Sequence, residues 1–155
     1  NLEKTVLHHD NDGDFFILPA HSYGLGVALE KMKVPENITV ICIGKSTYAR
    51  LGIIVNTTPA EAGWEGHLTL EFSNSSGADC RIYAEEGICQ LLFFEGDPCS
   101  TTYEDRRGKY QNQPEKVTLA KILQSAPELL LNSKVRCPSH PASAGVVLTM
   151  IPSLA

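Results

Sequence analysis

The sequence lacks any apolar run near the roughly 20 residues that a membrane-spanning helix needs. Its polar opening, NLEKTVLHHDNDGD, is unlike a secretory signal peptide, so a cytoplasmic location is expected. Positive charge is also scarce, because 13 Lys and Arg stand against 18 Asp and Glu, giving a formal net charge of −5 at pH 7. This balance argues against a nucleic-acid binder, but it leaves room for a local basic pocket that takes a phosphorylated small molecule.

Signatures of disulfides and metal sites are missing as well. The cysteines number five, include no CxxC pair, and fit neither a disulfide framework nor a zinc site. We predict reduced thiols at Cys42, Cys80, Cys89, Cys99 and Cys137. Residues 8–14 could bind a metal weakly, but a solvated polar terminus is the preferred interpretation, and no protein-bound metal is expected. GxGxxG, the GxxxxGK[ST] phosphate loop and the paired-cysteine zinc signature are all absent.

Short apolar and β-branched stretches dominate the chain before residue 115, where helical periodicity is almost missing. Strands are predicted at residues 21–30, 38–43, 53–55, 67–72, 81–84 and 88–94. The clearest alternation places Leu68, Leu70 and Phe72 on one side of a strand. The pattern predicts one all-β domain, a barrel or a sandwich, with only short helical segments.

Changes in composition divide the chain into three regions. We expect a mobile N-terminal segment at 1–14, a β domain at 15–122, and an irregular tail of unknown role at 123–155. Residues 100–116 are charged, rich in Gln and Tyr and poor in aliphatics, which predicts a flexible arm within the β domain. A short helix is predicted at 118–131.

Two segments carry groups suited to an anionic ligand. Residues 44–50, GKSTYAR, place hydroxyls and two cations directly after a buried strand, where backbone N–H groups and charge can meet phosphate oxygens. An ordinary polar turn is the alternative. Residues 103–113, YEDRRGKYQNQ, carry cations and aromatics that could close over such a ligand, with a solvated connector as the alternative.

Glu71 is a carboxylate in the middle of an apolar strand, opposite in direction to Leu70 and Phe72. Its side chain either faces solvent or lines a pocket. In a pocket, desolvation would raise its pKa toward neutrality and suit it to proton transfer.

Four ordered segments together resemble the dCTP deaminase family, a branch of the dUTPase-like trimeric β proteins. They are GKSTYARLGIIVN at 44–56, GWEGHLTLEFSN at 63–74, IYAEEGICQLLFFE at 82–95 and YEDRRGKYQNQ at 103–113. The resemblance runs from about Phe15 to Lys121. It implies a distorted dUTPase-like (β-clip) barrel that forms homotrimers, with active sites at the subunit interfaces.

The resemblance also implies a reaction, the zinc-independent hydrolysis of dCTP to dUTP and ammonia, which supplies dUMP and dTTP synthesis. The catalytic residues would be Glu71, as the general base that activates water, with Ser46 and Arg50. The residues implied to bind substrate are Lys45, Ser46, Thr47, Tyr48, Ala49, Arg50, Thr69, Leu70, Glu71, Gln90, Tyr103, Lys109 and Gln113. Mg²⁺ would arrive on the triphosphate, and dTTP is an expected inhibitor.

Alternatives remain within and outside this reaction. The same fold serves dUTPases and bifunctional enzymes that also release pyrophosphate from dUTP. The family's N-terminal portion has no counterpart here, so an N-terminally truncated, inactive nucleotide-binding module is the non-enzymatic alternative.

Overall fold

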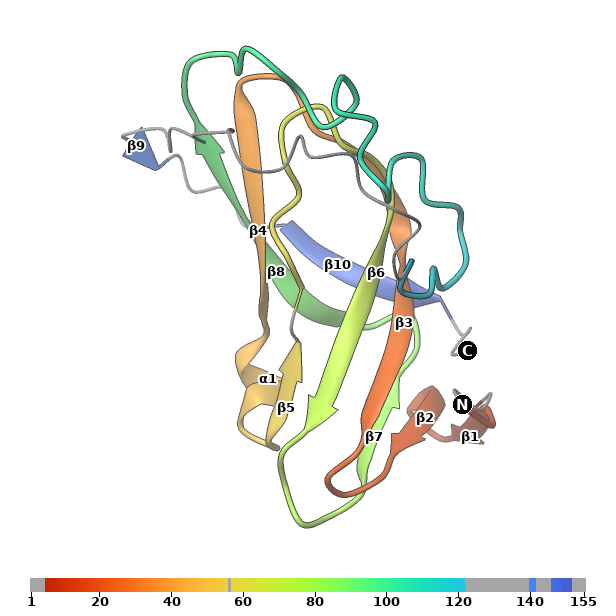
Figure 1. Ribbon diagram of the computed structural model, residues 1–155. Helices are drawn as coiled ribbons and strands as arrows, with labels where there is room; N and C mark the ends of the chain where they lie inside the picture. Colours follow the sequence, from red (N-terminus) through yellow and green to blue (C-terminus); the bar gives the residue numbers. More distant parts are fainter. Residues whose placement is uncertain (1–4, 56, 122–139, 142–145, 152–155) are drawn as a thin grey trace.

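The computed structural model describes residues 5–55, 57–121, 140–141 and 146–151. This part of the chain holds ten strands and one four-residue helix, α1 (Ser46–Ala49), which confirms the all-β prediction (Figure 1). The strands are β1 (His8–Asp10), β2 (Gly13–Leu18), β3 (Tyr23–Lys33), β4 (Ile38–Gly44), β5 (Ile53–Val55), β6 (Glu65–Asn74), β7 (Cys80–Tyr83), β8 (Gly87–Glu95), β9 (His140–Pro141) and β10 (Val146–Ile151). No helix in the described ranges is long and apolar enough to cross a membrane.

The larger sheet curls into a distorted barrel. Its strands follow the order β4-β8-β10-β3-β6-β5, and β9 pairs with β8. The two ends of this order meet because Val40 of β4 exchanges backbone hydrogen bonds of 2.9 and 2.8 Å with Ala60, which follows β5. All ladders in this sheet are antiparallel, and the curl places the inner faces of β4, β6 and β8 around one core.

A second sheet, in the order β1-β2-β7, includes residues that the sequence analysis assigned to a mobile segment. That assignment is wrong for residues 8–14, which form a hairpin. The turn is stabilised by Asp10, whose carboxylate accepts a 2.9 Å hydrogen bond from the Asp12 backbone. Asp10 also pairs with Arg81 at 2.7 Å and accepts a 2.9 Å hydrogen bond from the Tyr83 hydroxyl. Hydrogen bonding between distant segments therefore orders a stretch whose composition is that of a solvated tail.

The C-terminal region also departs from the expected irregular tail. β10, with the sequence VVLTMI, pairs with both β8 and β3, and its run of β-branched and apolar residues explains why it enters a sheet. The helix predicted at 118–131 is absent at residues 118–121, and the rest of that prediction lies outside the described residues.

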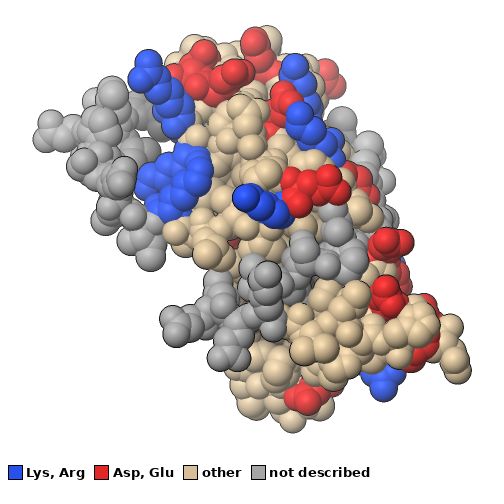
Figure 2. Space-filling view, turned by 90° about the vertical axis from the view of Figure 1, so that its right-hand side faces the viewer, with Lys and Arg blue, Asp and Glu red and all other residues tan. Residues whose placement is uncertain are grey.

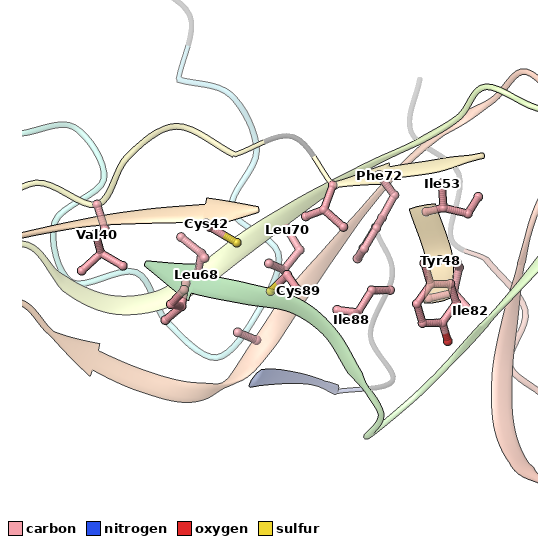
Figure 3. Packing of buried hydrophobic residues seen from close by; sticks show 14 of the residues in the cluster. Val40, Cys42, Tyr48, Ile53, Leu68, Leu70, Phe72, Ile82, Ile88 and Cys89 are labelled. Atoms are coloured by element: carbon pink, nitrogen blue, oxygen red, sulfur yellow. The ribbon is translucent and has the colours of Figure 1, made fainter. Parts of the chain in front are cut away.

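Apolar side chains from β4, β6, β7, β8 and α1 fill the barrel (Figure 3). β6 supplies Leu68, Leu70 and Phe72, as its alternation predicted, and Leu70 has no exposed surface. Asn74 ends the strand as a buried polar group, with its amide contacting the carbonyl oxygens of Leu18, Pro19 and Ala78 at 2.8–3.0 Å. β6 is thus fixed at one end by this amide and along its length by the core.

Truncation of Leu70 tests how much the buried side chains of β6 contribute to the stability of the fold. Leu70→Ala removes a fully buried side chain and should lower the free energy of unfolding by about 2–5 kcal/mol in urea denaturation. Leu51→Ala is the matched control, because Leu51 is 53% exposed, and it should change stability by less than about 0.5 kcal/mol. Equal effects of the two substitutions would contradict this assignment of the core.

Candidate functional site

β6 carries the candidate catalytic carboxylate on the face that points away from the core residues Leu70 and Phe72. Glu71 is half-buried on that face, and burial raises the pKa of its carboxyl group above the ordinary value. The register explains the burial, because Leu25 of β3 lies directly opposite Glu71 and is 8% exposed. Glu71 therefore lies beside an apolar neighbour and is partly shielded from solvent.

Tyr23 is the second polar group beside this carboxylate, and the sequence analysis did not select it. Tyr23 pairs with Ser73, which is two residues from Glu71 on the same face of β6. Tyr23 as a residue is 50% exposed. Burial and the negative charge of Glu71 together raise the pKa of the Tyr23 phenol. The strand alternation predicted at 21–30 could have placed Tyr23 on this face, but only the pairing with β6 identifies its neighbour.

The arm at 100–116, expected to be flexible, lies along the start of β6. The His67 N–H donates to the Gln113 carbonyl at 3.0 Å, and the Asn112 N–H donates to the Glu65 carbonyl at 2.8 Å. Gly66 and Gln113 form an isolated parallel bridge between the two segments. The arm thus extends the edge of the sheet over two residues.

Side chains add to this attachment. The Trp64 indole N–H donates to the Tyr110 carbonyl at 2.8 Å. The Thr69 hydroxyl donates to the Gln113 side-chain oxygen at 3.1 Å and accepts a 3.3 Å hydrogen bond from the Thr118 N–H. Thr69 and Gln113, both predicted substrate contacts, therefore contact each other, and Glu71 is two residues from Thr69 on the same face of β6.

Tyr103 makes contacts with other residues of the arm. Its hydroxyl accepts a 3.0 Å hydrogen bond from the Tyr110 N–H, and the Arg106 guanidinium lies 5.7 Å from its ring centroid. Arg106 also pairs with Glu61, which ties the arm to the loop before β6. Lys109 is exposed at the surface of the arm. On the face shown in Figure 2, Lys and Arg side chains are interspersed with Asp and Glu and do not form one large basic surface.

The second predicted segment forms α1 and the residues that flank it. Ser46, Thr47, Ala49 and Arg50 are exposed there, and Lys45 is half-buried. Tyr48 differs from its neighbours, because its side chain is 3% exposed and packs beside Ile53, Ile82 and Ile88 in the core (Figure 3). A ligand on this surface would meet the backbone of Tyr48, not its phenol ring.

The structure gathers the predicted site residues into two groups. The β6–arm group consists of Thr69, Glu71 and Gln113, and the α1 group consists of residues 45–50. Among the described residues, no hydrogen bond or ion pair joins Glu71 to the α1 group. Gln90 lies apart on β8, exposed, and Leu70 of the predicted set points into the core.

A cavity of about 270 Å³ lies between the end of β3 and the sheet formed by β4 and β8. Its walls include Met32, Val40 and Phe93, and none of the predicted site residues lines it. In the described ranges, no three His, Cys, Asp or Glu side chains gather into a group that could hold a metal ion.

Comparison with known proteins assigns the chain to a family. A family model described as dCTP deaminase-like matches residues 2–96. A Campylobacter jejuni protein named dCTP deaminase is 53% identical over 123 residues, which cover 79% of this chain. A Xylella fastidiosa protein of the same name is 54% identical over 107 residues, or 67% of this chain. The chain therefore belongs to the dCTP deaminase-like family, as the four sequence segments predicted.

Coverage of these relatives is partial. The chain spans 64% of the length of the Campylobacter jejuni protein and 56% of the Xylella fastidiosa protein. Among solved structures, the native EIAV dUTPase matches with a TM-score of 0.49 and 20% sequence identity, over 63% of this chain and 89% of that one.

The seating of the arm on β6 can be tested at Gly66. This residue has φ +147°, and a Cβ added to it would lie 2.5 Å from the Gln113 nitrogen. Gly66→Ala should therefore displace the arm and speed tryptic cleavage after Arg106, Arg107 and Lys109. The measurement is limited proteolysis followed by mass spectrometry.

Gly77→Ala is the matched control for this experiment. A Cβ there would lie 3.8 Å from the nearest atom, on His21, so cleavage in the arm should match that of the unmodified chain. Equal cleavage rates in the Gly66 and Gly77 variants would show that the arm does not depend on this close approach.

Proposed function

We propose that this protein carries the site of a dCTP deaminase, which hydrolyses dCTP to dUTP and ammonia. The observation that carries the proposal is Glu71, a half-buried carboxyl group with a raised pKa on a strand beside the docked arm. Membership of the dCTP deaminase-like family supports the same reaction. The product would feed dUMP and dTTP synthesis in the cytoplasm.

Glu71 acts as the general base. It takes a proton from water as the water oxygen forms a bond to C4 of cytosine, and it delivers that proton to N3, where it stays in the uracil product. The carboxyl group then moves the proton of the new C4 hydroxyl to the exocyclic amine. The C4–N bond then breaks, ammonia leaves, and the C4 carbonyl of uracil forms. A carboxylate whose pKa is raised by an apolar neighbour is a stronger base than one in open solvent, which suits it to this step.

The α1 group supplies the remaining catalytic contacts. Ser46 positions the water or the amino group by hydrogen bonding, and the Arg50 guanidinium stabilises charge that develops near the reacting carbon. Both side chains are exposed at the surface of α1 and free to meet a ligand there. The family resemblance implies a homotrimer whose active sites form between subunits, so that the α1 group and Glu71 of one site would come from neighbouring chains.

The nucleotide is held by side chains and backbone from four parts of the chain: residues 45–50, β6, β8 and the arm. The proposed substrate contacts are Lys45, Thr47, Tyr48, Ala49, Thr69, Leu70, Gln90, Tyr103, Lys109 and Gln113, with the three catalytic residues. Lys45 and Lys109 suit the triphosphate, which brings Mg²⁺ with it, and dTTP would compete for the same contacts. No zinc takes part, since water activation rests on Glu71.

Replacement of Glu71 tests the proposed base. Glu71→Gln keeps the size of the side chain but cannot accept a proton, so deamination should fall at least about 100-fold while dCTP binding is retained. Ammonia and dUTP release from Mg·dCTP measure the first effect, and calorimetry measures the second. In the unmodified protein the rate should fall as the pH drops through the raised pKa of Glu71, because only the carboxylate accepts the proton.

Glu95→Gln is the control, because Glu95 is an exposed carboxylate at the end of β8. Full activity in Glu71→Gln would exclude this residue as the base. Loss of activity in chelator-treated protein that zinc restores would overturn the zinc-free mechanism, and pyrophosphate release from dUTP would identify a dUTPase or a bifunctional enzyme. A folded chain that binds dCTP without turnover would be the non-enzymatic module.

Mixing of inactive variants tests the shared site. Ser46→Ala and Glu71→Gln should each be inactive alone. In randomly mixed homotrimers, about a quarter of the sites would combine an intact α1 group with an intact Glu71 from the neighbouring subunit, and activity should recover to that extent. Co-refolded chains and an ammonia assay provide the measurement. No recovery in verified mixed trimers would place the whole site in one chain.

A further inference from the structure

One carboxylate outside the predicted site contacts the α1 group through two different interactions. Glu86 lies in the turn between β7 and β8 and is exposed. Its Oε2 accepts a 3.1 Å hydrogen bond from the Tyr48 hydroxyl, and its Oε1 lies 3.9 Å from the Lys45 Nζ. The two oxygens of Glu86 thus bridge a core anchor of α1 and the cation that precedes the helix.

The contact with Tyr48 fixes where this carboxylate lies. The Tyr48 side chain is buried, and its hydroxyl also accepts a 3.1 Å hydrogen bond from the Tyr83 N–H. Burial, and then the negative charge of Glu86, raise the pKa of the phenol, so Tyr48 remains a hydrogen-bond donor at neutral pH. Because Tyr48 is held by the core, Glu86 is held as well.

The contact with Lys45 determines what the carboxylate does. The Lys45 N–H donates to the Ile88 carbonyl at 3.2 Å, so the backbone of Lys45 lies against the start of β8, directly after the Glu86 turn. The Lys45 side chain is 31% exposed and that of Glu86 is 46% exposed, so an anion from solvent can reach both. Any phosphate that engages Lys45 then also approaches the negative charge of Glu86.

We propose that Glu86 is a specificity-determining residue, an internal counter-ion that weakens the binding of polyphosphate at Lys45. The inference rests on the proposed function only in taking Lys45 as a phosphate contact. Two unit charges about 4 Å apart in water interact by an amount equal to about a fivefold change in affinity. Glu86 therefore lowers the affinity for anions that depend on Lys45 alone. Relative to these, ligands that gain further contacts through their sugar and base bind more tightly.

The test uses inorganic tripolyphosphate as the probe, with calorimetric titration of the full chain. Glu86→Gln removes the charge but keeps an oxygen that can accept the Tyr48 hydrogen bond. This variant should bind tripolyphosphate about fivefold more tightly than the unmodified chain. The gain should shrink at about 1 M salt, where charges are screened within about 3 Å, whereas a change in structure would persist.

Two further variants control the experiment. Glu85→Gln removes the same charge one residue earlier in the turn and should leave the affinity nearly unchanged. Lys45→Gln combined with Glu86→Gln should lose most of the gain, because the effect requires both partners.

Several results would overturn the proposal: equal affinities for Glu86→Gln and Glu85→Gln, weaker binding by Glu86→Gln, or no binding of tripolyphosphate by any variant. The dCTP assay separates this outcome from that of the proposed function. A Glu86 effect on tripolyphosphate without deamination would support the counter-ion and reject the deaminase. Deamination without a Glu86 effect on tripolyphosphate binding would support the deaminase and reject the counter-ion.

Discussion

The pairing of β6 with its neighbours is the constraint on which the rest of the molecule depends. β6 lies between β3 and β5 and alternates strictly, so every second side chain enters the core and every other one faces outward. One strand register therefore places both Leu70 in the core and Glu71 on the outward face. A slip of one residue would expose Leu70 and bury the carboxylate, which explains why the core and the candidate site cannot vary independently.

The position of Glu71 has a cost in stability. Its carboxyl pKa is raised by burial beside Leu25, so the folded state favours the protonated form. The stability associated with this group is fully present below the ordinary glutamate pKa, and is lost as the pH rises through the raised value. At neutral pH the charged group therefore destabilises the fold, and a carboxyl group kept at such a cost is a candidate for a functional role.

Strand alternation made the barrel largely predictable, since the repeating apolar positions around Leu70 specify both a strand and its buried face. Contacts between distant segments were not predictable from local composition. The composition of residues 8–14 is that of a solvated tail. Only the contacts of Asp10 with Arg81 and Tyr83 show that these residues form a hairpin. Similarly, Tyr48 appears in a polar segment, and only its packing in the core shows that it does not share the surface of Arg50.

The α1 group and the β6–arm group are each held by contacts of their own. Tyr48 anchors α1 to the core, while the arm anchors Thr69 and Gln113 to the opposite face of β6. The fold therefore positions the two groups through different contacts, and Glu86 holds its charge beside the α1 group.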